Sequence, residues 1–330
     1  MKKLKACLFV SVFFLSSFTM QAQGKLVSKD SLRLSANFKD NSPAPIYYPY
    51  NKKRVSAITA VNIAGYGGAL AGLNAAWYAK QPRSGFHFFN DNAEWLQVDK
   101  TGHAYSAYSE SRASMELWRW AGLPRNQRIW IGGLTGLGYQ TVIEVLDGFA
   151  DEYGFSVGDF AANLLGTGMF MAQEFAWDQQ RVMLKFSFHK RNYGQADLNL
   201  RADKIYGKTE IERFLKDYNA QTYWLSANIN SLVPDINFPK WLSLAVGYGA
   251  DGMFGARSNI AVDKTGAVIF DRSDIRRYRQ WYLSPDIDLT KIKTNKKGLK
   301  VLFFVLSAVK FPAPTLEFSN GNVKGHWIVF

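Results

Sequence analysis

Acidic, histidine and amide side chains recur at helical spacing in three stretches of this chain between residues 99 and 174. Steps of three, four or eight residues place the members of each stretch on one face of a helix. The surrounding sequence is apolar in places, as in AANLLGTGMFMA over residues 161–172. Acids in such surroundings are costly unless they pair, bind a metal ion or a proton, or line a wet cavity. The three sets are Asp99, His103, Ser106 and Glu110; Gln140, Glu144, Asp147 and Asp151; and Asp159, Asn163, Gly166 and Glu174.

Three kinds of site fit these residue types: a metal site, a structural network and a hydrolase centre. In the first the acids would be neutralised by a metal ion, and in the second by other polar side chains. A metal site would draw its ligands from His103, Glu144 and Asp159, and Asp99 and Asp147 would add carboxylates. A di-iron bundle would need two Glu-x-x-His pairs, whereas these helices hold a single histidine. A structural network would instead let the polar groups satisfy one another and fix the register of the helices. Its members would be Asp99, Lys100, His103, Glu144, Asp147, Asp159 and Asn163.

The third kind of site is the centre of a hydrolase. His103 would act as the general base, and Asp99, four residues earlier, would orient its ring. The nucleophile would be Ser106 or Ser156. No nucleophile elbow or other specific spacing supports this arrangement. We therefore expect a structural network rather than an enzyme, and we predict no cofactor.

Four predicted helices position these residues. Residues 99–121 form a helix that Gly122 and Pro124 stop, residues 127–149 form the next, and a helix that opens at Ser156 or Gly158 ends near residue 177. Residues 55–78 carry no charge and are rich in glycine and alanine, so they are long enough to cross a membrane and suited to close helix packing. Short connections between the four helices predict an up-down, membrane-type bundle over residues 55–180.

The N-terminus has the pattern of an export signal. Residues 1–23 combine three lysines, an apolar run and small or polar residues, so we predict a signal peptide there and an extended leader over residues 24–54. The only cysteine, Cys7, lies near the start of the apolar run, whereas a lipid-carrying cysteine follows such a run. We therefore expect no lipid attachment, and without Cys7 the chain has no disulfide and no cysteine nucleophile.

The net charge of +13 indicates which partners suit the chain. Three of the 40 basic residues lie in the predicted signal, so 37 would remain against 27 acidic residues. In an exported chain this excess favours membrane lipid or lipid A phosphates as partners over nucleic acid, and a solvated basic surface is the alternative. No particular protein partner is indicated. We expect an exported, membrane-associated protein of the cell envelope, on the periplasmic face or in the outer membrane rather than in the inner membrane.

After residue 180 the sequence changes to short aromatic runs with partial alternation, which predicts a β-rich region over residues 181–330. About six strands are visible, and Asn320 and Gly321 form a hairpin signal. Residues 208–219 have a helical pattern, and residues 298–311 fit either a short buried helix or a strand. The predicted fold is α+β, a helical bundle followed by a packed β-rich region. The alternative is a partial outer-membrane β-barrel, which the terminal Phe330 favours and the small number of strands opposes.

Three blocks of sequence carry a resemblance to known families. DKTGHAYSAY (residues 99–108), EVLDGF (144–149) and GFSVGDFAANLLG (154–166) resemble, in this order, the YfiM-like family, a group of predicted periplasmic or outer-envelope bacterial proteins of unknown function. The pattern is also similar to that of the wider VanZ-like membrane family, which has a glutamine after the central glutamate where this chain has Asp147 nearby. The resemblance implies an envelope location and no established reaction.

Overall fold

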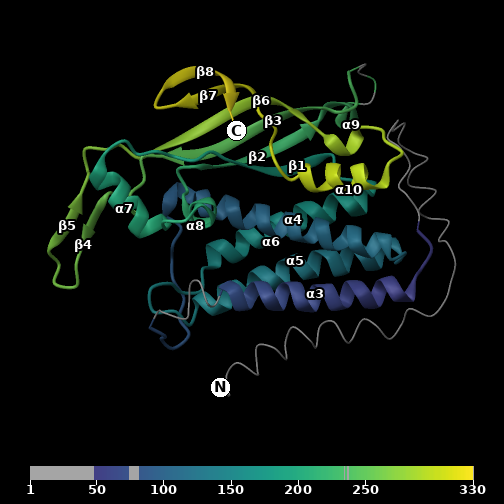
Figure 1. Cartoon of the computed structure of the whole chain (residues 1–330), viewed down its shortest axis with the longest axis horizontal. Helices are drawn as coiled ribbons and strands as arrows, with labels where there is room; N and C mark the ends of the chain where they lie inside the picture. Colours follow the sequence, from purple (N-terminus) through teal and green to yellow (C-terminus); the bar gives the residue numbers. More distant parts are fainter. Residues whose placement is uncertain (1–47, 74–81, 234, 236–237, 330) are drawn as a thin grey trace.

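The computed structural model describes residues 48–73, 82–233, 235 and 238–329. Figure 1 shows three layers: helix α3 (Lys52–Leu73), then helices α4 (Val98–Trp120), α5 (Arg125–Asp147) and α6 (Val157–Trp177), and finally a β-sheet. The chain is therefore α+β, with helices first and strands after them, as predicted. The predicted signal peptide and residues 24–47 of the predicted leader lie outside the described residues.

The four helices begin close to the predicted positions, and α4, α5 and α6 also end close to them, because their local signals are strong. Residues 74–78 of the predicted first helix lie outside the described residues. The side chain of Asn51 accepts a hydrogen bond from the backbone of Arg54 at 3.1 Å, so α3 starts three residues before the predicted position. The side chain of Ser156 caps α6 by accepting from the backbone N–H of Asp159 at 3.0 Å. After α4, Gly122 takes a positive φ of 82°, in a position where a Cβ would meet the backbone of Pro49.

Helices α4, α5 and α6 pack closely on one another, and small residues make this possible. A Cβ added at Gly166 of α6 would lie 2.0 Å from the carbonyl oxygen of Ala104 in α4. A Cβ at Gly132 of α5 would lie 2.6 Å from the Cβ of Met115 in α4. The fourth helix, α3, packs through Ile58 on two buried residues near the end of α4, and the ring of its Tyr66 lies 5.0 Å from that of Tyr139 in α5. The bundle is therefore three tightly packed helices with α3 beside them.

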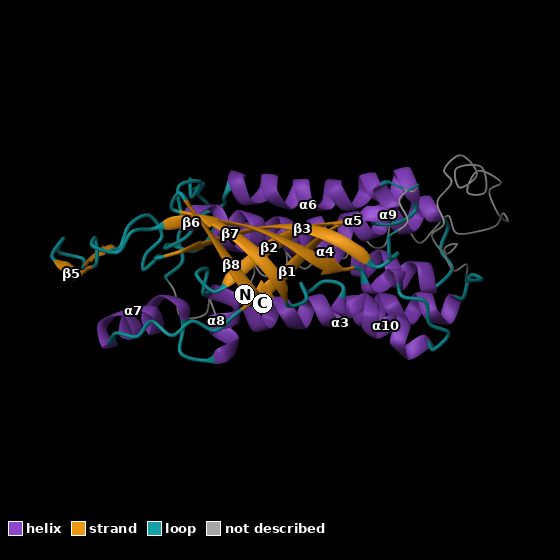
Figure 2. Ribbon diagram, turned by 90° about the horizontal axis from the view of Figure 1, so that it is seen from above, coloured by secondary structure: helices purple, strands orange, loops and turns teal. Residues whose placement is uncertain are grey.

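The sheet contains six antiparallel strands in the order β1-β2-β3-β6-β7-β8. Asn320 and Gly321 form the predicted hairpin turn between the last two strands, with φ values of 50° and 76°. The strands are β1 (Val182–Phe188), β2 (Gln221–Asn228), β3 (Leu242–Asp251), β6 (Tyr278–Ile287), β7 (Ala313–Ser319) and β8 (Asn322–Val329). Figure 2 shows these strands crossing above the helices.

The sheet is open, so the alternative of a β-barrel is wrong. Within the described residues, β1 and β8 are the two edges, and no ladder joins them. One isolated parallel bridge links Phe186 of β1 to Val309, just before β7. Six strands are too few to close a membrane barrel, for which about eight is the lower limit.

Short elements connect the main strands. Residues 298–311, left open as helix or strand, contain helix α10 (Lys297–Leu306), which is exposed along much of its length rather than buried. Helix α8 (Glu210–Lys216) confirms the helix predicted within residues 208–219. The remaining connections are α7 (Ala196–Tyr206), α9 (Ile229–Leu232), a two-stranded hairpin of β4 (Ile260–Val262) with β5 (Val268–Asp271), and the 3-10 turns η3 (Trp95–Gln97) and η4 (Leu289–Lys291).

The start of α4 packs against the sheet. The ring of Tyr105 lies 5.7 Å from that of Phe186 and 5.8 Å from that of Tyr223, centroid to centroid. A Cβ at Gly102 would lie 2.8 Å from the hydroxyl of Tyr223, so the helix approaches the strand closely. This contact holds the first two turns of α4 in place, and these turns carry the polar residues described next.

Candidate functional site

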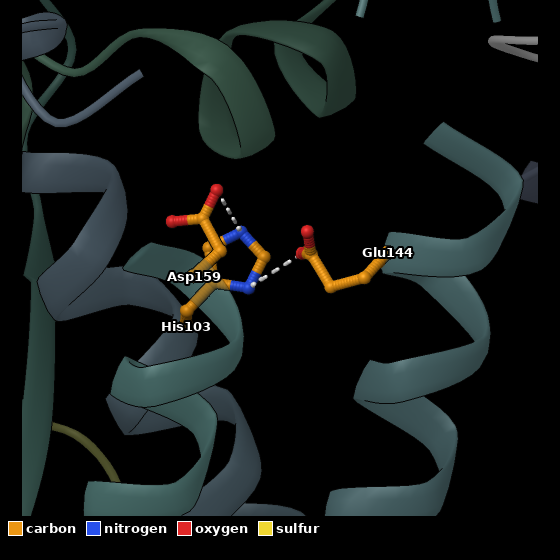
Figure 3. Close-up of side chains that lie close together, drawn as sticks. All are labelled: His103, Glu144 and Asp159. Carbon is orange, nitrogen blue, oxygen red and sulfur yellow. Dashed lines mark ion pairs between the residues drawn. The ribbon is translucent and has the colours of Figure 1, made fainter. Parts of the chain in front are cut away.

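His103 lies between two carboxylates that come from two other helices. Its Nδ1 is 3.5 Å from Oε1 of Glu144 in α5, and its Nε2 is 3.8 Å from Oδ2 of Asp159 in α6 (Figure 3). The side chains of Glu144 and Asp159 are only 1% and 8% exposed, and that of His103 is 22% exposed. The three helices therefore place one imidazole between two buried acids.

Lys100, one turn before His103, joins three aspartates. Its Nζ lies 2.7 Å from Asp91, 3.2 Å from Asp99 and 2.8 Å from Asp159, measured to one carboxylate oxygen of each. Because Asp159 contacts both Lys100 and His103, all of these groups form one polar centre. The ammonium group occupies the position that a cation would take among the three aspartates.

Asp91 is the member that sequence analysis missed. It lies in the connection before α4, where no helical period relates it to the other acids. Its Oδ1 accepts a hydrogen bond from Oγ of Ser156 at 2.6 Å, and the backbone N–H of Ser156 donates to Oε2 of Glu144 at 3.2 Å. The residue that caps α6 thus links the connection, α5 and α6.

The contacts needed for the predicted hydrolase centre are not made. Asp99 pairs with Lys100 instead of orienting His103. Ser156 donates its hydroxyl proton to Asp91, and no described hydrogen bond joins Ser106 to His103. In this arrangement His103 faces two acids and no nucleophile.

Several polar atoms around His103 lack a hydrogen-bond partner among the described residues. They include Nδ1 of His103, Oε1 of Glu144 and both amide atoms of Asn163, a residue that is fully buried. Asp147 lies one turn beyond Glu144, outside the His103 contacts, and its charge acts on Glu144 from there. The centre is therefore crowded with polar groups that are only partly satisfied.

Burial changes the proton affinities in this centre. Burial, followed by the nearby charges of Asp159 and Asp147, raises the pKa of Glu144 to about 9. Burial also raises the pKa of Asp99 to about 7, although the charge of Lys100 opposes the shift. Burial lowers the pKa of His103, against the opposing charge of Asp159. At neutral pH these shifts favour a neutral imidazole facing a protonated Glu144.

The rest of the three polar stripes does not join this centre. Gln140 donates to Glu110 at 2.9 Å, which forms a separate pair between α5 and α4. Glu174, near the far end of α6, pairs with Arg119 at 3.1 Å. Gly166 serves the close approach to Ala104 described above. Helical spacing therefore identified the correct faces, although only the residues near one end of the bundle converge.

Two overlapping sets of residues have the geometry to hold a metal ion. One is His103, Glu144 and Asp159, and the other is Asp91, Asp99 and Asp159; in each set the ligand atoms lie within 4.8 Å of one another. The second set already surrounds the ammonium of Lys100. In the first set Nδ1 of His103 faces Glu144 and Nε2 faces Asp159, so a single ion would bind only one of the two ring nitrogens.

A family model described as a predicted periplasmic lipoprotein (DUF2279) matches residues 86–173. The matched segment contains every residue of the polar centre and helices α4 to α6 almost completely. No curated protein and no solved structure matches the chain. The description agrees with the envelope location that the sequence motifs imply, and it names no reaction. Its word lipoprotein differs from the expectation of no lipid attachment.

Proposed function

We propose that this chain is a membrane-associated protein of the bacterial cell envelope with a structural or lipid-proximal binding role. The observation that carries this proposal is the exposure of α3. The segment over residues 52–72 of this helix is long and apolar enough to cross a membrane. Only 6% of its most apolar 18-residue stretch is buried within the protein. A core helix of the same composition would be covered by its neighbours.

The surroundings of α3 support a membrane contact. Val61 and Ile63 are 63% and 54% exposed, which is unfavourable in water. At the start of the helix, the guanidinium of Arg54 lies 4.6 Å from the ring centroid of Trp120. Arginine and tryptophan are a common combination where a helix enters the interface of a bilayer.

In this proposal the polar centre holds the helices behind α3 in register. The centre joins α4, α5, α6 and the connection that precedes them, so its pairs form only when all four are in place. Buried polar groups of this kind specify one packing arrangement and penalise the others. The tight glycine contacts between the same helices need such a register.

Fractionation of cells that make the protein, followed by a carbonate wash, tests the membrane role. We expect the protein to stay in the membrane pellet. Val61→Lys combined with Ile63→Lys should shift it toward the wash, because two charges would enter the apolar surface of α3. The matched control is Leu200→Lys with Ile211→Lys, at positions 70% and 74% exposed on α7 and α8, which should not change the distribution. Complete release of the unmodified protein would contradict the proposal.

A second candidate function is an envelope hydrolase or a metal-dependent enzyme centred on His103. The observation in its favour is that Nδ1 of His103 and Oε1 of Glu144 face each other without a hydrogen bond, so both are available to a substrate, a water or an ion. His103→Ala separates the two roles. A structural role predicts a stability loss of about 1–3 kcal/mol and a phenotype that follows protein abundance. An enzyme would lose function at normal abundance and melting temperature, and metal analysis would then distinguish the two enzyme classes.

A further inference from the structure

The sheet buries polar groups on the face opposite to the one that α4 contacts. Its buried face carries an ion pair between Lys185 and Asp286, at 2.7 Å and with both side chains 0% exposed. Nε1 of Trp224 donates to Oγ of Ser187 on the same face at 2.9 Å. Antiparallel sheets with one solvated face normally bury apolar residues and expose polar ones. Here the enclosed face carries these polar groups beside the buried cluster of Trp224, Ala245 and Tyr282. The apolar face is covered by α4 near β1 and the start of β2 and is exposed farther along the sheet.

The outward face, called here the apolar sheet face, consists of residues that the strand register places side by side. One row runs Leu225, Val246, Leu283 and Leu316, and the next runs Trp281, Phe318 and Val323. The second row continues into Tyr248 and Tyr223, which pack against α4 and the segment before it, so the face is open from Trp281 onward in that row. Leu316 is 45% exposed, Val246 48% and Trp281 50%. A groove of about 550 Å³ lies on the same face and is lined mainly by leucine, proline and Trp327. An apolar, groove-bearing surface of this extent marks an interaction site.

Helix α10 adds a second apolar surface with a basic end. Val301 and Val305 are 64% and 58% exposed, so the apolar stripe of the helix points away from the protein. Its inner side is held on α4, where Arg112 donates to Oγ of Ser307 at 2.8 Å and stacks on the ring of Phe304 at 4.5 Å. The outward direction of the stripe is therefore built into the fold.

The charges around α10 indicate the chemistry of the partner. Four exposed lysines lie before and within its first turn, namely Lys293, Lys296, Lys297 and Lys300. No acidic residue occurs from residue 289 to residue 316. Helix α10 lies toward the end of the molecule at which α3 begins with Lys52, Lys53 and Arg54 (Figures 1 and 2). Both basic segments can therefore reach the same layer of anionic head groups.

We propose that α10 and the apolar sheet face form a lipid-contacting surface, in which the apolar side chains meet acyl chains and the lysines of α10 bind the phosphates of anionic lipids. This inference rests on the proposed membrane role. Exposed apolar rows on a sheet whose other face encloses an ion pair are the pattern that lipid as solvent favours, as it does on the outside of membrane strands. The unpaired backbone N–H and C=O groups along the open edge of β8 need water or lipid head groups as hydrogen-bond partners. Acyl-chain contact is therefore assigned to the rows from β2 to β7.

Lipid-resident quenchers test this surface in the full chain. Cys7→Ser removes the only cysteine, and single cysteines at Leu302 on α10 and at Leu316 on the apolar sheet face then carry a fluorophore. The labelled proteins are reconstituted into phosphatidylcholine vesicles, with or without phosphatidylglycerol and with spin labels on the acyl chains. We expect both positions to be quenched. A label at Val268 in the β4–β5 hairpin, which is 60% exposed, is the matched control and should not be quenched.

The head-group contact has its own measurement. A spin label on the phosphatidylglycerol head group should quench a probe at Leu302 more than the same label on phosphatidylcholine. Combining Lys296→Gln, Lys297→Gln and Lys300→Gln should remove this preference, to which each lysine contributes roughly fivefold. The matched control replaces Lys204 and Lys208, near the end of α7, with glutamine. This variant should keep the stronger quenching by labelled phosphatidylglycerol.

The outcomes separate this inference from the proposed membrane role. Protein that does not enter vesicles at all contradicts the membrane role itself. Protein that enters vesicles through α3 while the probes at Leu302 and Leu316 stay unquenched overturns the lipid-contacting surface. Unquenched probes that cross-link between two copies would assign the same surface to self-association and would also overturn it.

Discussion

Replacing Glu144 with glutamine tests the protonation state of the polar centre. Burial and two neighbouring acids raise the pKa of Glu144 from its usual 4.5 to about 9. A protonated carboxyl group and an amide have nearly the same shape, and the amide oxygen can still accept the hydrogen bond from the backbone of Ser156. The amide N–H₂ group can also donate to the unpartnered Nδ1 of His103. We therefore expect Glu144→Gln to stabilise the protein at neutral pH.

The magnitude follows from the proton that Glu144 must take up on folding. A carboxyl group whose pKa is raised by folding has no such cost below the pKa of the unfolded chain, and the cost grows as the pH rises toward the pKa of the folded protein. Between pH 4.5 and pH 7 the cost reaches about 3 kcal/mol at 1.36 kcal/mol per pH unit. The glutamine variant avoids this cost. Its advantage should be absent near pH 4.5, about 3 kcal/mol at pH 7 and larger still near pH 9.

Thermal unfolding of the detergent-solubilised protein at a series of pH values is the assay. A difference of this size corresponds to a rise in melting temperature of roughly 5–10 °C at pH 7. Glu152→Gln, at an exposed position in the loop after α5, is the matched control and should leave the melting temperature unchanged at every pH. A melting temperature that falls at pH 7 would refute the reasoning, because it would mean that an ionised Glu144 pairs with a protonated His103. A variant that is more stable but inactive would favour the enzyme reading of the centre.

Two further substitutions test how the helices are held together. Lys100→Met should lower the free energy of unfolding by about 3–5 kcal/mol, since Asp99 and Asp159, which are buried, and the partly buried Asp91 would lose their common cation. Chemical denaturation measures this, and an unchanged midpoint would contradict the assigned role. Gly166→Ala should cost about 1–3 kcal/mol, because the new Cβ would lie 2.0 Å from the carbonyl oxygen of Ala104. Gly168→Ala, where nothing lies within 4 Å, should instead be neutral or stabilising by up to about 1 kcal/mol, and equal effects of the two alanines would rule out close packing as the cause.

The sequence was sufficient to predict the elements whose signals are local. The predicted helix over residues 99–121 corresponds to Val98–Trp120, because the helical period of its polar face and the stop at Gly122 depend only on neighbouring residues. The Asn320 and Gly321 turn is correct for the same reason. The separation of the chain into helices followed by strands also follows from a change in the period of the apolar residues near residue 180.

The polar centre could be predicted in part. His103, Glu144 and Asp159 carry a visible signal, because a polar residue at helical spacing in an apolar stretch stands out. Asp91 carries none, since the connection before α4 has no period from which its direction could be read. Glu174 shares a predicted polar stripe with Asp159 and Asn163, although it lies some 20 Å along the helix axis from Asp159 at 1.5 Å per residue.

The sequence by itself therefore determined the type of each main helix and strand and the face of each helix that carries polar residues, because steric preference and periodicity act over a few neighbouring residues. Only the tertiary structure decided which of those polar residues meet, that Lys100 lies among three aspartates, and that residues 297–306 form an exposed helix. It also decided that the sheet encloses the face that carries Lys185 and Asp286, and that α4 covers part of the apolar face while the rest is exposed. An alternating strand has one polar and one apolar face in either case, and the packing of distant segments determines which of them is buried.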